Sequence, residues 1–145
     1  MKHVAVMLTV MGLSTGAAAQ NAIPDLKGTW TGKGESVVFG SNQHHPGAQT
    51  GDAPRVGEIE FNFVVTGQVG RGAWGYSYSD VGPTREPFAW SLSTTGRTAI
   101  GADTVGYFQI TLESADLMEL CYAHNQLSPS RSIVTSCAMY KRTKR

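Results

Sequence analysis

LMELCYAHNQLSPSRSIVTSCAMY, residues 117–140, contains both cysteines of the chain and has Pro129 midway between them. An antiparallel hairpin that pairs Cys121 with Cys137 has to turn at this proline, in a loop of about residues 126–131. We therefore expect two strands tied by one disulfide. Closing the 15 residues between the cysteines stabilises the folded state by about 3 kcal/mol in the chain-entropy model.

Direct pairing of the two cysteines also fixes the register of the hairpin. It sets Tyr122 opposite Ser136 and Ala123 opposite Thr135. Because side chains alternate between the two faces of a strand, one face of the segment 117–124 is apolar. This apolar face comprises Met118, Leu120 and Tyr122, opposite to Glu119 and Cys121.

Alternation with a period of two recurs about every ten residues in the rest of the chain, and helical periodicity is absent. Besides the hairpin, the predicted strands are 26–39, 56–66, 73–79, 86–93, 98–102 and 107–112. Eight antiparallel strands with short connections can close into an up-and-down barrel that holds side chains or one small ligand. A two-sheet β-sandwich is the competing architecture. We favour the barrel because consecutive hairpins suit a meander, whereas sandwiches usually need longer crossings.

The start of the chain has the pattern of a secretory signal. Lys2 precedes an apolar core at residues 4–13, and three alanines end at residue 19. We expect cleavage there, export to the periplasm or the extracellular space, and a single domain over residues 20–145. The apolar core has about half of the roughly 20 residues needed to cross a bilayer, so we expect no membrane-spanning segment. An even number of cysteines in an oxidising compartment favours a disulfide.

The charge balance argues against nucleic acid as a partner. Without Lys2, eleven Lys and Arg residues balance eleven Asp and Glu residues, and four of the bases crowd into the last five positions. Binding phosphate backbones needs clustered cations across a face. Only 16% of the residues are charged, against about 25% in ordinary globular domains, which is typical of short strands with tight turns.

Large rings alternate with small residues in the third and fourth predicted strands, and further rings follow in the later strands. Turned inward, they either fill the barrel as core or line an apolar pocket with hydroxyl groups near its mouth. Turned outward, they form a patch that faces another protein. The predicted ligand-binding residues are Trp74, Tyr76, Tyr78, Phe88, Trp90, Phe108 and Tyr122.

Catalytic and cofactor motifs are absent from the sequence. No nucleophile elbow, H-E-x-x-H or S-x-x-K occurs, and each cysteine is better explained by the other. Residues 70–75 spell G-x-G-x-x-G, but a strand follows where a dinucleotide site needs a helix. The adjacent His44 and His45 point apart in an extended loop, which disfavours a shared metal ion. We expect a protein that is not an enzyme and has no cofactor or metal.

The residues Gly28-Thr29-Trp30, preceded by Pro24-Asp25-Leu26, resemble the Gly-x-Trp feature that opens the barrels of the calycin superfamily, which includes lipocalins and avidins. The resemblance implies that Trp30 plugs one end of the barrel. It also implies that a basic residue of the last strand, Lys141 or Arg142, lies over this ring. The segment 41–54, with His44 and His45, is similar in position to the lid of lipocalins.

The sequence thus favours an exported, calycin-like barrel that binds a small apolar or amphipathic ligand in an aromatic-lined interior. The alternative is a protein-interaction or inhibitor module of the cell envelope with a solid core.

Overall fold

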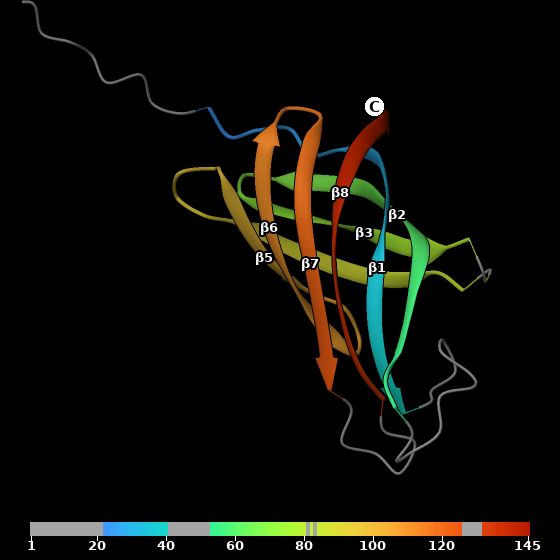
Figure 1. Ribbon diagram of the computed structural model, residues 1–145. Helices are drawn as coiled ribbons and strands as arrows, with labels where there is room; N and C mark the ends of the chain where they lie inside the picture. The colour runs from blue at the N-terminus through green and yellow to red at the C-terminus, as the bar shows by residue number, and fades with distance from the viewer. Residues whose placement is uncertain (1–21, 41–52, 81, 83, 126–131) are drawn as a thin grey trace, which may run out of the picture.

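The computed structural model describes residues 22–40, 53–80, 82, 84–125 and 132–145 (Figure 1). Their regular elements are strands, and no helix, let alone one able to cross a membrane, occurs among them. The strands are β1 (Gly28–Gly40), β2 (Arg55–Val69), β3 (Gly72–Ser79), β4 (Glu86–Leu92), β5 (Thr98–Ala102), β6 (Gly106–Ser114), β7 (Leu117–Asn125) and β8 (Ser132–Lys144).

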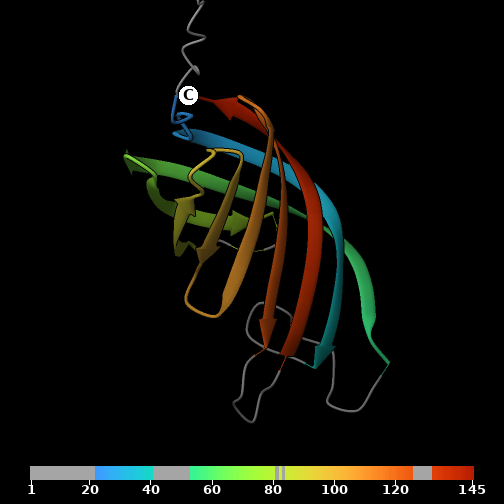
Figure 2. The same ribbon diagram turned by 90° about the vertical axis from the view of Figure 1, so that its left-hand side faces the viewer.

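Each strand pairs antiparallel with its neighbours in sequence, and β1 pairs with both β2 and β8. The β1–β8 ladder runs from Thr29 opposite Lys144 to Gly40 opposite Ser132, so the last strand closes the sheet on the first. Figure 2 shows β1, β7 and β8 side by side along the barrel wall. The predicted all-β up-and-down barrel is confirmed, and the alternative of a sandwich is wrong.

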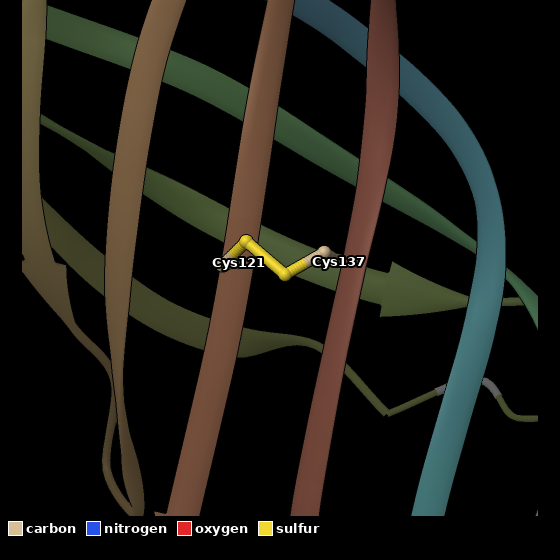
Figure 3. Close-up of a disulfide and its surroundings, with 2 residues drawn as sticks. All are labelled: Cys121 and Cys137. Atoms are coloured by element: carbon tan, nitrogen blue, oxygen red, sulfur yellow. A yellow bond between two sulfur atoms is a disulfide. The ribbon is translucent and has the colours of Figure 1, made fainter.

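The disulfide and the register that it implies are also confirmed. Cys121 of β7 lies opposite Cys137 of β8 and is bonded to it (Figure 3). Their Cα atoms are 4.1 Å apart, and Tyr122 lies opposite Ser136 in the same ladder. The bridge is on the outer face, since Leu120, the neighbour of Cys121, is buried in the interior. A disulfide fits an oxidising compartment.

Several predicted features lie outside the described residues. These are the export signal at 1–19, the hairpin turn at 126–131, and His44 and His45 of the predicted lid.

The centre of the barrel is a cluster of rings gathered around Phe63 of β2. Its ring centroid lies 5.2–5.6 Å from those of Phe88 and Trp90 of β4, Phe108 of β6 and Tyr140 of β8. Edge-to-face contacts of this kind add to the free energy gained by burial. These contacts hold both sides of the barrel together across its interior.

β3 presents small residues to this interior, whereas the rings of Trp74 and Tyr76 lie on the outside. Ala73 and Ser77 are buried, whereas Trp74 is 47% exposed. Large inward rings on the flanking strands lie directly opposite the small residues: Trp90 opposite Ala73, Phe88 opposite Gly75, and Phe63 opposite Ser77. The interior of an eight-stranded barrel is just wide enough for its side chains, so large rings on one strand require small partners on the next.

This arrangement corrects the inward orientation expected for Trp74 and Tyr76. Trp74 covers Gly67 on the outside of the barrel. Tyr76 lies on the face opposite to buried Ser77 and stacks under the guanidinium of Arg85 at 4.5 Å. Neither ring reaches the interior, because the space beside β3 is already filled from β2 and β4.

One end of the barrel is closed by Trp30, which is completely buried and donates its Nε1–H to the carbonyl oxygen of Leu26 at 2.9 Å. The Cζ atom of Arg142 lies over the ring at 4.5 Å from its centroid. Gly28 is required at this end, since its φ is 127° and a Cβ there would collide with the carbonyl of Lys144. The arrangement is the one that the Gly-x-Trp resemblance implies.

Candidate functional site

A cavity of about 260 Å³ lies toward the other end of the barrel, where β3 runs to β4 and β5 runs to β6. Its lining comes from six of the strands and from residues of these two connections. Apolar cavities of about 150 Å³ already admit benzene, so this one is large enough for a substituted ring.

The inner part of the cavity is apolar. Phe63, Phe108, Leu120 and Tyr140 line it, and all four are at most 5% exposed. The ring of Tyr122 continues the wall, with its centroid 5.0 Å from that of Phe108. The cavity is therefore walled by the same rings that pack the barrel core.

The outer part of the cavity, which we call its rim, is polar. Hydroxyl groups come from serine, threonine and tyrosine side chains, and two carboxylates come from Glu86 and Asp103. Glu86 opens β4 opposite Ser77, which is buried, so the two side chains share the inward face. Asp103 directly follows β5.

Asp103 is held in place by the tight turn between β5 and β6. Its Oδ1 accepts hydrogen bonds from the backbone N–H of Val105 at 2.8 Å and of Gly106 at 2.6 Å. Side chains of Asp commonly bond the backbone two residues on, which is why aspartate favours such turns. The carboxylate is thus fixed at the rim before any ligand arrives.

Tyr122 connects this carboxylate to a buried polar chain. Its hydroxyl lies 2.9 Å from Nδ1 of His124, whose Nε2 lies 2.9 Å from Oγ of Ser132. Burial raises the pKa of Tyr122 far above its ordinary value, and nearby Asp103 and Glu86, with a hydrogen bond to Asp103, raise it further. Tyr122 is therefore a neutral phenol at physiological pH.

The contact between Ser132 and His124 does not make a nucleophile. Activation of a serine by histidine needs a hydroxyl that a substrate can reach, and Ser132 is completely buried. Ser132 is also outside the set of described residues that line the cavity. We interpret the pair as a structural contact that fixes the orientation of the His124 imidazole.

The predicted site residues fall into three groups. Tyr78, Phe108 and Tyr122 line the cavity. Phe88 and Trp90 stack on each other at 4.5 Å in the ring cluster and are absent from the described lining. Trp74 and Tyr76 lie on the outer face.

Several lining residues were missed by sequence reasoning. Glu86 carries a signal that could have been used, because it continues the inward alternation of Phe88 and Trp90. His124 carries a similar signal, because it continues the inward alternation of Leu120 and Tyr122 on the same strand. Asp103 carries none, because it reads as a turn residue, and the structure brings it to Tyr122 from the turn between β5 and β6.

Metal binding finds no support in the described parts of the chain, where no three His, Cys, Asp or Glu side chains gather closely enough to hold an ion.

Comparison with known proteins adds little to this geometry. No protein-family model matches the chain, and no curated protein matches it. Among solved structures, the S-type phycobiliprotein lyase CPES from Guillardia theta is similar with a TM-score of 0.38 and 11% sequence identity, over 83% of this chain and 89% of that chain. The closed barrel of eight consecutive antiparallel strands itself fits a calycin-like fold.

Proposed function

We propose that this protein is an exported, non-enzymatic binding protein that holds a small apolar or amphipathic ligand in the cavity of its barrel. The observation that carries the proposal is the cavity itself, with apolar rings at its inner part and a few fixed polar groups at its rim. This combination is the usual composition of a small-molecule site, in which burial supplies affinity and polar groups orient the ligand.

Two further features support the proposal. The closed end, with Arg142 over Trp30, resembles that of the calycin barrels, many of which carry ligands. The signal-like segment at residues 1–19 and the disulfide suit a periplasmic or extracellular carrier. Within this proposal Tyr78, Phe108 and Tyr122 contact the ligand, whereas Phe88 and Trp90 support the cavity wall from the core.

Native mass spectrometry of the protein purified from its own host tests the proposal directly. We expect a retained small molecule as added mass, and a thermal shift with at least one lipid, retinoid, biotin-like or haem-like compound. Absence of both results overturns the proposal and favours an interaction or inhibitor module.

A cavity-filling variant provides the control. Ser136 lines the cavity opposite Tyr122, so Ser136→Phe places a ring inside it and should abolish ligand retention. Ser91 is exposed on β4, and Ser91→Phe adds the same ring outside the barrel. Equal retention by both variants means that the ligand binds elsewhere.

A further inference from the structure

The formally charged side chains among the described lining residues are acidic. Glu86 and Asp103 contribute carboxylates, and neither lysine nor arginine occurs among the described lining residues. Carboxylates and phosphates are usually recognised by Arg or Lys. An anionic ligand such as a fatty acid therefore finds like charges at this rim and no lysine or arginine from the described lining.

The polar groups at the centre of the rim can accept hydrogen bonds from a ligand. Gly106, whose N–H donates to Asp103, lies against the hydroxyl end of the Tyr122 ring. Burial raises the pKa of Tyr122, so this group is a neutral phenol, and a phenol oxygen and a carboxylate both accept hydrogen bonds.

Asp103 keeps capacity for further donors. A carboxylate has about four lone-pair positions. The backbone N–H groups of Val105 and Gly106 occupy two of them, both on Oδ1. A ligand that donates a hydrogen bond to Oδ2 leaves the turn undisturbed.

The walls next to this rim are aromatic. The rings of Phe108 and Tyr122 stand 5.0 Å apart beside Phe63 and Tyr140. Aromatic faces attract cations by about 0.5 to 2 kcal/mol, depending on desolvation. Both the acids and the rings thus favour the same kind of head group.

We propose that the cavity selects ligands with a protonated amine on a small apolar body, the amine lying at Asp103 and Tyr122 and the apolar part among the inner rings. This inference rests on the proposed function and specifies the chemical class of its ligand. Asp103 and Tyr122 are the specificity-determining residues, and Glu86 is the second carboxylate of the described lining.

Three probes of matched size but different charge test the inference: phenylbutylamine, phenylbutanol and phenylbutyrate. Titration calorimetry should give the amine at least about tenfold tighter binding than the alcohol, and the carboxylate weaker binding than both. Equal binding of all three, or preference for the carboxylate, overturns the inference and leaves the proposed function standing. If none binds, the charge of the molecule retained in native mass spectrometry decides, and absence of any retained molecule overturns both proposals.

Asp103→Asn is the matching variant. The amide oxygen still accepts from Val105 and Gly106, so the turn is kept while the charge is removed. We expect the affinity for the amine to fall about tenfold and the affinity for the alcohol to stay unchanged. Glu119→Gln removes a charge from the exposed face of β7 and should change neither.

Glu86→Gln is a second test, and it leaves the turn between β5 and β6 unchanged. It should weaken amine binding and leave alcohol binding unchanged, since it removes one of the two carboxylates of the described lining. If amine binding is unaffected in both Asp103→Asn and Glu86→Gln, the rim acids do not select the ligand and the inference is wrong.

Discussion

The guanidinium of Arg142 lies over the ring of Trp30, with its Cζ atom 4.5 Å from the ring centroid, and the two residues are direct partners in the ladder between the last strand and the first. The Arg142 side chain is only 4% exposed and forms an ion pair with Asp116. It also donates to the carbonyl oxygens of Lys27 at 2.9 Å and Asp25 at 2.6 Å. The side chain of Arg142 on the last strand therefore binds the segment before β1 and covers Trp30 at the closed end of the barrel.

Arg142→Lys should destabilise the protein even though it keeps the charge. A lysine ammonium cannot cover the Trp30 ring and reach several carbonyls from one planar fork. We expect a loss of about 2 to 4 kcal/mol in the free energy of unfolding, measured in urea, because hydrogen bonds from charged groups are worth about 1.5 to 3 kcal/mol each.

Arg145→Lys is the control for this variant. Arg145 also pairs with Asp116, but its side chain is 69% exposed, and exposed ion pairs contribute little. A loss in Arg145→Lys as large as in Arg142→Lys would mean that the Asp116 ion pair, and not the cover over Trp30, stabilises this end.

Removal of the disulfide by the double substitution Cys121→Ser and Cys137→Ser should lower the free energy of unfolding by about 3 kcal/mol. The bridge joins β7 and β8 on the outer face, so ligand binding in the cavity should be unchanged under conditions where the variant is folded. Urea unfolding and ligand titration of the same sample measure both. Loss of binding in the folded variant would show that the bridge shapes the cavity.

The strands and the register of the last hairpin could be predicted from the sequence because both depend on short-range patterns. Alternation identifies the strands, and the position of Cys121 and Cys137 fixes the pairing of Tyr122 with Ser136. Closure follows from the meander, in which every strand pairs with its sequence neighbour.

The direction of the rings in β3 could not be predicted by the same reasoning. Both faces of this strand satisfy the alternation, and a shift of one residue exchanges them. The rings of Phe88 and Trp90 on β4 decide which face of β3 points inward, because opposite them the interior has room only for Gly75 and Ala73. The polar rim could not be predicted either, because its acids come from separate parts of the sequence, β4 and the turn after β5.

Trp74 and Trp90 lie in adjacent pairs of the β3–β4 ladder but on opposite faces. Their replacement should therefore lower the free energy of unfolding by very different amounts. Trp90→Ala removes a ring that is 3% exposed in the core and should cost about 3 to 5 kcal/mol. Trp74→Ala removes a ring that is 47% exposed on the outer face and should cost about 1 kcal/mol. Urea unfolding of both variants compares them, and equal losses would contradict the assignment of the two faces.

Stability should fall at alkaline pH because of two buried tyrosines. Burial raises the pKa values of Tyr122 and Tyr140, so the folded protein keeps both protons above pH 10, where tyrosines of the unfolded chain lose theirs. The unfolded state then binds fewer protons, and the free energy of unfolding decreases by about 1.4 kcal/mol per pH unit for each residue. This stability is fully present below about pH 10.

Tyr140→Phe isolates one of these contributions. Its free energy of unfolding, measured from about pH 9 to 11.5, should decline less steeply above about pH 10 than that of the unchanged protein, by about 1.4 kcal/mol per pH unit. Equal slopes would mean that Tyr140 ionises in the folded state as readily as in the unfolded chain.

Gly106 keeps the space that Tyr122 needs beside Asp103. A Cβ at position 106 would collide with the Tyr122 ring at its hydroxyl end, so Gly106→Ala should push this hydroxyl away from the carboxylate. We expect a loss of about 1 to 3 kcal/mol in stability, as for other overpacked interiors. Preference for the amine probe should decrease as well, since the rim is distorted.

Gly57→Ala is the matched control, because a Cβ there meets no atom within 4 Å. Unfolding in urea and calorimetry with the amine and alcohol probes measure both effects, and an unchanged selectivity in Gly106→Ala would show that the position of the Tyr122 hydroxyl does not matter for ligand choice.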